Sequence, residues 1–415
     1  RRGCVILLFS GVDILKLKVG LFNDSFPPTI DGVANTVKNY ADIITARFGT
    51  AVVVTPKYPN VTDDYPYEVR RYSSAKFGEK IPYRVGNPFS PLTVRKLRQE
   101  NFDILHVHCP FCSGVLAHQV AMMHSNPLPV VFTYHTKFDI DIDNFVHNRA
   151  VNTLARKLVL SSISYADEVW AVSKGAIESM RVLGYEGDVR VMPNGTDFEK
   201  GPGDAAEIAE INRMYLLEPD VPVLLFCGRM MWYKNIKIIL DAIKKISATD
   251  LRFRALFVGD GPDRPAIEQY ARSIGIYDRI TFTGAFYDRK KIKAFFTRAD
   301  LFMFPSTYDT SGLVVKEAAS SGCPSILTAG SCAAEGVCDM RSGLLCEETA
   351  ESFAEKLSAA LSDPDLLKRL GRGAEEEVYL SWDDSVAAAW KRYEYLIDSA
   401  KSSDKKALRR LKDEK

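Results

Sequence analysis

Short apolar runs alternate along most of this chain with longer stretches in which apolar positions recur at helical spacing. The first two runs are residues 17–23 and 51–55, and a helical stretch from Gly32 to Phe48 separates them. Further runs follow at 103–108, 129–135, 167–173 and 189–192. Strands that alternate with helices in this way pair in parallel, so the pattern predicts a doubly wound α/β domain.

A polar stretch rich in Gly, Pro and Asp, residues 194–206, interrupts this rhythm. The alternation then restarts with apolar runs at 222–228, 254–259, 279–284, 300–305 and 324–328, and helical patterns follow at 350–362 and 383–400. The sequence therefore predicts a second α/β domain. We expect an N-terminal extension at 1–16, domains at 17–195 and 196–380, a final helix at 381–400 and a charged, solvated tail at 401–415.

Composition restricts the partners of this chain. Its 415 residues carry a formal net charge of +1, which argues against a nucleic-acid partner or a charged field over the whole surface. The eight cysteines form no spaced framework, and no apolar run reaches the ~20 residues that span a bilayer. Residues 1–16 are short for a signal peptide and lack a small-residue cleavage pattern. We therefore expect a cytoplasmic protein.

The most informative segment runs from Phe304 to Glu317, an apolar strand followed by a Ser-Gly turn that opens a helix. Parallel sheets bind ligands beyond the carboxyl ends of their strands, and helix N-termini favour anions. Two facing domains of this kind would hold the ligand in the cleft between them. A diphosphate would meet Ser311, Gly312 and Leu313, while Asp309 and Glu317 could accept sugar hydroxyls.

Two further turns follow strands of the second domain. The first contains Gly228, followed by Arg229 and, five positions later, Lys234. The two cations, Arg229 and Lys234, could together neutralise a departing diphosphate. The turn Gly259-Asp260-Gly261-Pro262 begins like a dinucleotide fingerprint but lacks its third glycine. A tight turn beside a bound ligand is thus favoured over a nicotinamide site. An NAD-dependent oxidoreductase is therefore the third and weakest of the functional hypotheses that the sequence allows.

In the first domain, the helix that begins at Gly32 would present its N-terminus to the cleft, where a phosphate could bind. His108 and His135 end neighbouring strands and are expected to face the same cleft. A histidine at a strand end can be structural or functional, and two at adjacent positions favour function.

One acidic motif suggests a metal site and one thiol motif suggests a metal or redox site, and we reject both interpretations. The run from Asp139 to Asp143 has the D-x-D spacing of a metal-dependent transferase, but it falls in an expected loop, and Arg229 and Lys234 already supply neutralising charge. Cys109 and Cys112 have the spacing of half a zinc site with no second pair of ligands. We expect no metal and no cofactor.

Residues 70–98 combine eight cations with a single acid, Glu79, and four aromatic side chains. The cations are Arg70, Arg71, Lys76, Lys80, Arg84, Arg95, Lys96 and Arg98. This segment can be a solvated loop or a contact for anionic lipid headgroups, to which each nearby cation contributes about 1 kcal/mol.

Taken in order, these motifs resemble the retaining glycosyltransferases of family 4, which have the two-domain GT-B fold. The likeness covers the chain from about Leu17 to Ala400. It rests on G-R-x(4)-K at Gly228, G-x-G-P at Gly259, the P-N-G that ends at Gly195, and the E-x(7)-E spacing from Asp309 to Glu317. The sequence departs from the pattern at its first acid, which is Asp309 instead of Glu.

The resemblance implies roles for the site residues. Glu317 would bind the nucleotide ribose, Asp309 and residues 311–313 the donor sugar and phosphate, Gly32 the phosphate from the opposite domain, and His135 the reacting sugar. Asp260, Gly261 and Pro262 would lie beside the donor, and Asp24 and His108 on the acceptor side. The final helix would cross back to the first domain.

Within the family, three segments look most like diacylglycerol glucosyltransferases and related glycolipid synthases, which are peripheral membrane enzymes. They are Asp24 to Val33, Thr133 to Thr136 and the basic segment. The implied reaction moves a hexosyl group with retention from a nucleotide sugar to a lipid or glycolipid hydroxyl. UDP-glucose is the favoured donor, ahead of UDP-galactose and GDP-mannose. The alternatives are a soluble or polyprenyl-linked glycan acceptor and, in another class, a non-catalytic nucleotide-sugar-binding protein.

Overall fold

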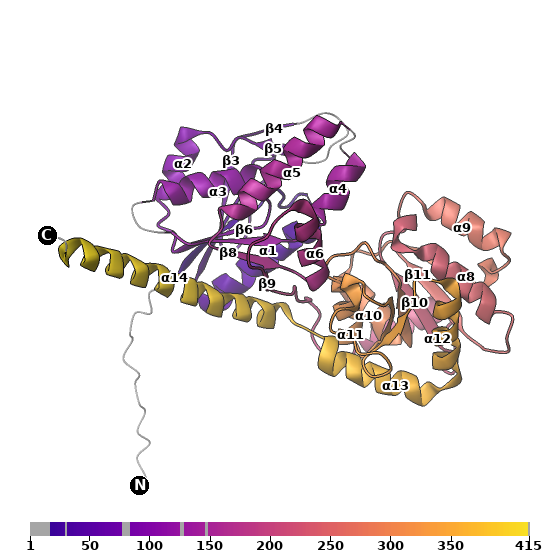
Figure 1. The fold of residues 1–415 in the computed structure, drawn as a ribbon. Helices are drawn as coiled ribbons and strands as arrows, with labels where there is room; N and C mark the ends of the chain where they lie inside the picture. Colours follow the sequence, from indigo (N-terminus) through magenta and orange to yellow (C-terminus); the bar gives the residue numbers. More distant parts are fainter. Residues whose placement is uncertain (1–16, 30, 77–83, 125–127, 146–147, 414–415) are drawn as a thin grey trace, which may run out of the picture. The chain divides into compact units, whose positions relative to one another are not determined.

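The computed structural model, shown as a ribbon in Figure 1, describes residues 17–29, 31–76, 84–124, 128–145 and 148–413. The expected extension at 1–16 lies outside the described residues, as do 77–83 of the basic segment. Contacts divide the chain into two compact units. The first holds the residues through Thr133, Ser161–Val169 and the chain from Ala389, and the second holds Tyr134–Leu160 and Trp170–Ala388.

The first sheet has seven strands in the order β3-β2-β1-β6-β7-β8-β9. Its opening strand, β1, pairs in parallel with β2 on one side and with β6 on the other. The chain thus changes direction across the sheet between β1 and β6, which is a topological switch point. The strands are β1 (Lys18–Phe22), β2 (Thr50–Pro56), β3 (Glu68–Tyr72), β6 (Ile104–Val107), β7 (Val130–Tyr134), β8 (Glu168–Ala171) and β9 (Arg190–Val191).

Helices follow most of these strands, as the alternation predicted. They are α1 (Gly32–Ile43), α2 (Pro91–Arg98), α3 (Cys112–Met122), α4 (Phe138–Phe145), α5 (Arg149–Ser164) and α6 (Lys174–Leu183). A short antiparallel pair, β4 (Ser74–Lys76) and β5 (Arg84–Gly86), stands apart from the main sheet.

The second sheet has six parallel strands in the order β12-β11-β10-β13-β14-β15. Every residue of β10 is buried, as expected when helices cover both faces of a parallel sheet. The chain runs outward from β10 to β12 and then returns to β13, so the second switch point lies between β10 and β13. The strands are β10 (Val223–Cys227), β11 (Arg254–Val258), β12 (Ile280–Gly284), β13 (Leu301–Phe304), β14 (Ser325–Thr328) and β15 (Leu344–Cys346).

Helices on this sheet pack in two groups: α8 contacts α9 and α12, and α10 contacts α7 and α11. Right-handed crossovers that run in opposite directions place α8 and α10 on opposite faces of the sheet. The helices are α7 (Ala205–Met214), α8 (Ile236–Ile246), α9 (Arg264–Ser273), α10 (Arg289–Arg298), α11 (Leu313–Ser320), α12 (Ala350–Ser362) and α13 (Pro364–Gly373). The predicted α/β class with two parallel sheets is confirmed.

The long helix α14 (Trp382–Asp413) carries the chain back among the residues of the first unit from Ala389 onward. There the Trp390 ring stacks on Phe48, with ring centroids 5.4 Å apart, and the Tyr393 hydroxyl lies 2.6 Å from His106 Nδ1. The helix continues to Asp413, so most of the segment expected as a frayed tail is helical.

The sequence pattern missed several short or polar elements. Strand β3 reads Glu-Val-Arg-Arg-Tyr and has buried and exposed positions mixed, because it lies at the sheet edge. Strand β15 has three residues, too few for a periodic signal. The run from Asp139 to Asp143, expected in a loop, lies in helix α4 (Phe138–Phe145), where isoleucines alternate with aspartates.

Candidate functional site

The second switch point gathers the loops that follow β10, β11 and β13. After β11, Gly259 has φ of 140°, and a Cβ there would lie 2.0 Å from the Gly228 carbonyl oxygen. A Cβ on Gly261 would lie 2.3 Å from the Met230 carbonyl oxygen. The loops after β10 and β11 therefore touch backbone to backbone, and the two glycines serve this close approach.

Lys234 and Asp309 meet across this switch point. Lys234 follows β10 and Asp309 follows β13, and the Lys234 ammonium lies 2.9 and 2.8 Å from the two Asp309 carboxylate oxygens. Ser306 donates a further hydrogen bond of 2.6 Å to the Asp309 carboxylate. The predicted cation and sugar-binding carboxylate thus form one ion pair, while Arg229 is exposed on the same loop.

The turn before α11 has features of an anion site. Gly312 precedes the helix with φ of 56°, and a Cβ there would lie 3.0 Å from Ala333 Cα. The Ser311 hydroxyl is buried and has no hydrogen-bond partner in the described part of the chain. Backbone N–H groups in the first turn, from Leu313 onward, point out of the helix start, where negative charge is favoured.

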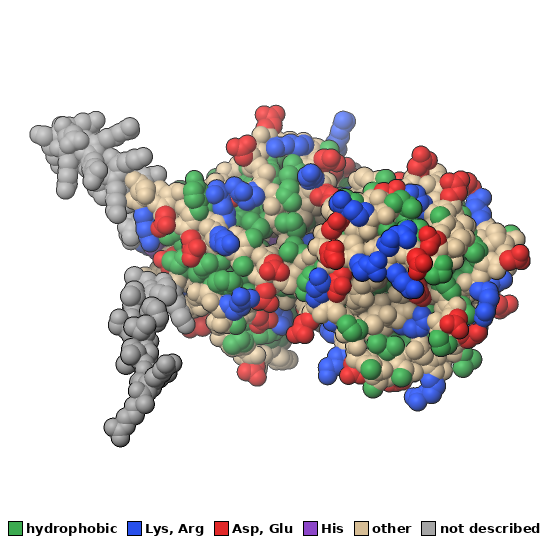
Figure 2. Space-filling model, turned by 90° about the horizontal axis from the view of Figure 1, so that it is seen from below, with side chains coloured by type: hydrophobic (Ala, Val, Ile, Leu, Met, Phe, Trp, Pro, Cys, Tyr) green, Lys and Arg blue, Asp and Glu red, His purple; other side chains and the backbone are tan. Residues whose placement is uncertain are grey.

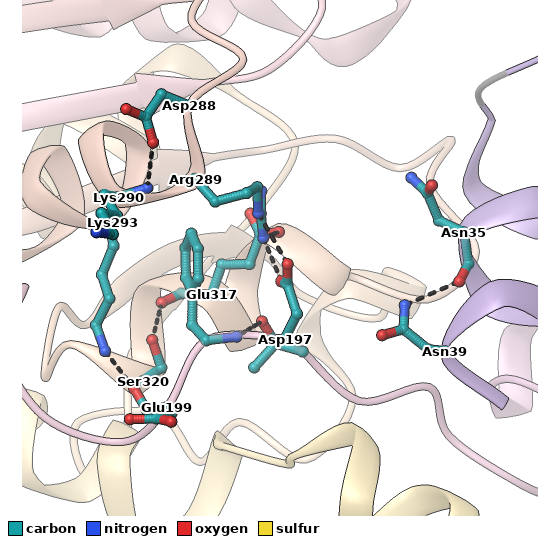
Figure 3. A network of polar contacts seen from close by, with 12 residues as sticks. Asn35, Asn39, Asp197, Glu199, Asp288, Arg289, Lys290, Lys293, Glu317 and Ser320 are labelled. Carbon is teal, nitrogen blue, oxygen red and sulfur yellow. Dashed lines mark hydrogen bonds and ion pairs between the residues drawn. The ribbon is translucent and has the colours of Figure 1, made fainter. Parts of the chain in front are cut away.

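Glu317 lies in α11 and pairs with an arginine that the sequence analysis did not single out. The Arg289 Nη2 atom lies 2.7 Å from Glu317 Oε1, and the same guanidinium binds the Asp197 carboxylate, with Nε 3.0 Å from Oδ2. Figure 3 shows Arg289 between these two carboxylates. Burial raises the pKa of Glu317, and Arg289 opposes this shift.

Sequence reasoning missed Arg289 because its partners are distant in the sequence. Arg289 opens an Arg-Lys-Lys run that has the look of a solvated helix start. Glu317 is 28 positions away and Asp197 is 92 positions away, so no local spacing reveals the contact. The one available signal was Asp197, an acid two residues beyond the P-N-G.

His135 follows β7 and belongs, with residues 134–160, to the second unit. The Thr310 hydroxyl donates a hydrogen bond of 2.7 Å to the His135 carbonyl oxygen, which places His135 close to Asp309 in the structure. Burial lowers the pKa of the imidazole to about 3. The ring is therefore neutral over the physiological range and can act by hydrogen bonding, but not as a cation.

The predicted residues of the first unit lie around its own switch point. Helix α1 begins at Gly32 as predicted, and Asp31 caps it by accepting from the Ala34 N–H at 2.7 Å. Asp24 follows β1 and accepts from the Ser113 N–H at 2.8 Å, at the start of α3. Burial raises the pKa of Asp24.

The two strand-end histidines of β6 are buried and lie against each other. The His106 and His108 ring centroids are 3.9 Å apart, and both rings contact Tyr40. His106 also lies 2.6 Å from the Thr133 hydroxyl, so its two ring nitrogens bind side chains of the first unit. His106 is therefore structural, and His108 packs beside it.

The acidic D-x-D run has protein partners. Asp139 accepts a hydrogen bond from Ser179, and Asp143 lies 2.7 Å from the Arg156 guanidinium. Within the described residues, no group of His, Cys, Asp and Glu side chains is arranged to hold a metal ion. Cys109 and Cys112 are free thiols, and burial raises the pKa of Cys112 to about 11.

The basic segment divides into two parts in the structure. The Arg71 side chain is 8% exposed and paired with Asp63 at 2.8 Å, and Arg70 lies 2.7 Å from Glu100. Arg95, Lys96 and Arg98 are exposed on α2, beside the exposed side chains of Phe89 and Leu92. On the face drawn in Figure 2, cationic and anionic side chains are interspersed. Because Arg70 and Arg71 are paired with acids, the patch that remains for a lipid surface is smaller than the sequence suggested.

Two family descriptions match this chain. Residues 30–200 match the family described as Glycosyltransferase Family 4, and residues 207–377 match Glycosyl transferases group 1. The two matches lie end to end and together cover most of the chain. Among the described residues, no helix is long and apolar enough to cross a membrane.

Individual proteins are also similar. The chain is 23% identical over 358 residues to the Alpha-monoglucosyldiacylglycerol synthase of Streptococcus pneumoniae, which spans 84% of this chain and 80% of that protein. It is 26% identical over 288 residues to the N-acetyl-alpha-D-glucosaminyl L-malate synthase of Bacillus anthracis, over 68% of this chain and 71% of that protein. The Anabaena protein HepE, solved in complex with UDP-glucose, has the same fold, with a TM-score of 0.67 and 17% identity over 92% of this chain and all of that one.

Proposed function

Because this chain belongs to the family 4 glycosyltransferases, enzymes of the GT-B fold, we propose that it moves a hexosyl group from a nucleotide sugar to a diacylglycerol or glycolipid hydroxyl. The favoured donor is UDP-glucose, and the product is an α-glycoside formed with retention of configuration.

One observation carries the donor part of this proposal. The switch point between β10 and β13 brings together the Lys234–Asp309 pair, the start of α11 and the Ser311 hydroxyl, which has no hydrogen-bond partner among the described residues. A diphosphate needs cations and N–H donors, and a sugar needs carboxylate acceptors. This arrangement supplies both within one unit of the protein.

In the proposed reaction the acceptor oxygen attacks the anomeric carbon as the bond to the diphosphate oxygen breaks. The acceptor proton passes to the departing phosphate on the same face, so no carboxylate nucleophile is needed. Lys234 and Arg229 would offset the negative charge that develops on the leaving group, where preorganised charge has its greatest effect. The neutral His135 would donate or accept a hydrogen bond to the reacting sugar. These cations take the place of a metal ion.

The lipid acceptor rests on two supports. A relative that resembles this chain over most of its length is named as a diacylglycerol glucoside synthase. The exposed face of α2 carries Arg95, Lys96 and Arg98 beside exposed Phe89 and Leu92, and such a face suits an anionic bilayer. We propose that α2 docks the first unit on that surface.

An acceptor screen tests the activity. Labelled UDP-glucose, UDP-galactose and GDP-mannose are each offered with diacylglycerol vesicles, a glycolipid and L-malate, with and without excess EDTA. We expect glucosylated diacylglycerol, an α-anomeric NMR signal and equal rates with EDTA. Product on malate alone would replace the lipid acceptor by a soluble one, and UDP binding without product on any acceptor would favour the non-catalytic alternative.

Charge reversal on α2 tests the membrane contact separately. Replacing Arg95, Lys96 and Arg98 by Glu should abolish sedimentation with anionic vesicles and leave UDP affinity unchanged. In the unaltered protein, sedimentation should weaken with salt, because the Debye length falls from about 10 Å at 0.1 M to about 3 Å at 1 M. The matched control reverses Lys368, Arg369 and Arg372, which are exposed on α13. Equal sedimentation of the two variants contradicts docking through α2.

A further inference from the structure

Arg289 is held more firmly than an ordinary surface arginine. It is the first residue of α10, whose preceding residue Asp288 caps the helix by accepting from the Lys290 N–H at 2.9 Å. Two guanidinium nitrogens, Nε and Nη2, bind the Asp197 carboxylate, and the guanidinium lies over the Phe198 ring, 4.1 Å from its centroid. Three contacts, all from the adjacent residues Asp197 and Phe198, thus fix the direction in which Nη2 points.

That direction is toward Glu317. The Arg289 Nη2 atom reaches Glu317 Oε1 at 2.7 Å, while the Glu317 side chain is 17% exposed. Arg289 is therefore a bridge between two carboxylates (Figure 3). Asp197 lies in the polar stretch 194–206, here called the connecting segment, and Glu317 lies in α11.

Few charged groups face Glu317 in the structure. Arg289 reaches it from α10, Asp197 acts on it from the connecting segment, and the Cys227 thiol at the end of β10 interacts with it electrostatically. Asp197 and burial disfavour the ionised carboxylate, and Arg289 favours it. Cys227 is neutral near pH 7, because burial and Glu317 raise its pKa to about 12. Arg289 is the cation that opposes protonation of Glu317 among these neighbours.

We propose that Arg289 is a positioning residue of the donor site: it keeps the partly buried Glu317 carboxylate ionised and oriented to accept the hydroxyls of the nucleotide ribose. This inference rests on the donor assignment above. Arg289 acts through Glu317, and Asp197 acts through Arg289 by holding the guanidinium in place.

The sign of the expected pH effect follows from the charges. The carboxylate form accepts hydroxyl donors, so UDP affinity falls as pH drops through the pKa of Glu317. Removing the guanidinium raises that pKa further, because a nearby opposite charge commonly lowers a carboxyl pKa by about 1–3 units. In a variant that lacks the Arg289 guanidinium, the loss of UDP affinity must therefore begin at higher pH. Raising the pH must restore the affinity.

The test measures UDP binding by calorimetry between pH 5 and 8.5 at constant ionic strength. Arg289→Gln should shift the acidic fall in affinity upward by about 1–3 pH units and regain most of its affinity at the alkaline end. Arg289→Lys should lie between this variant and the unaltered protein. All variants are compared at equal pH, so that the titration of UDP itself affects each of them equally. The matched control is Lys290→Gln, at a neighbouring exposed lysine of α10.

Asp197→Asn distinguishes two effects of Asp197: its negative charge near Glu317 and its anchoring of the Arg289 guanidinium. Loss of a negative charge alone would lower the pKa of Glu317 and move the fall in affinity to lower pH. Loss of the anchor that holds Arg289 would move it to higher pH, and we expect this second result. Thermal melting of each variant shows that the fold is retained.

Three results overturn the inference. An Arg289→Gln variant that matches the unaltered protein at every pH shows that Glu317 does not depend on the guanidinium. A variant that binds weakly by the same factor at every pH shows a role unconnected with ionisation. If the unaltered protein fails to bind UDP at any pH, the donor assignment itself is wrong and the positioning role falls with it.

Discussion

The two carboxylates eight positions apart at the second switch point are held in different ways. Asp309 lies in a loop, its side chain 29% exposed, with Ser306 of the same loop and Lys234 of the loop after β10 as partners. Glu317 lies in a helix, its side chain 17% exposed, with a guanidinium that is itself tied to another carboxylate. Asp309 is held by two loop residues, Ser306 and Lys234, whereas Glu317 is held by Arg289 at the start of another helix. We therefore expect Asp309 to adjust with its loop more readily than Glu317, which lies in a helix.

The largest expected effect comes from removing the cation of the Asp309 pair. Lys234→Ala should lower kcat roughly 10²- to 10³-fold, because it deletes a preorganised charge that meets the departing diphosphate. Arg229→Ala, on the exposed part of the same loop, should cost roughly 10- to 100-fold. Steady-state kinetics with UDP-glucose measure both losses.

The control for these variants is Lys237→Ala, since Lys237 is exposed on α8 and paired with Asp241. It removes the same charge outside the site and should leave kcat unchanged. Rates near those of the unaltered enzyme in both site variants would contradict the donor assignment.

A smaller effect is expected from Glu317→Gln, which keeps the side chain's shape and removes its charge. A hydrogen bond to a charged group contributes about 1.5–3 kcal/mol, so UDP affinity should fall roughly 10- to 100-fold at pH 8. The acidic fall in affinity assigned to Glu317 should also disappear. Calorimetry provides both readings, and Glu351→Gln, an exposed acid on α12, is the control. Unchanged affinity would mean that Glu317 does not face the nucleotide.

The smallest effect is expected from Asp309→Glu, which lengthens the loop carboxylate by one methylene. The ion pair with Lys234 can be kept by movement of the loop, so kcat/KM should change by about 10-fold or less, well short of the 10²-fold cost of a badly misplaced group. Asp309→Asn, which breaks the pair, is the comparison and should cost more. Equal losses in the two variants would show that the loop is as rigid as the helix.

The sequence predicted those parts of the molecule that depend on local pattern. The alternation of apolar runs identified most strands of both sheets, with β3 and β15 as exceptions, and the helix start at Gly32 and the turn at Gly259 follow from the requirements of caps and backbone contacts. The pairing of Lys234 with Asp309 was not predicted, although both residues were expected in the site. Neighbouring strands of a parallel sheet bring their loops together, but side-chain partners within those loops depend on geometry.

Contacts between distant segments were the main omission. Arg289 carries no local signal, and neither does Lys316, which α11 presents next to Glu317. Burial lowers the pKa of Lys316 to about 8, and its ammonium donates a hydrogen bond to the Asn194 carbonyl. In the sequence nothing near this lysine indicates that contact. Its environment is set by a segment 122 positions away.

The backbone contact between the loops after β10 and β11 bears on how this enzyme can evolve. Any side chain at Gly259 or Gly261 would overlap a carbonyl oxygen of the neighbouring loop, at 2.0 and 2.3 Å. Random mutagenesis should therefore return almost no active variants at these two positions, whatever donor is used for selection. Arg229, exposed on the partner loop, carries no such restriction. A laboratory search for altered donor preference has more sequence space to explore on the loop after β13, where Asp309 already differs from the usual glutamate, than in this glycine pair.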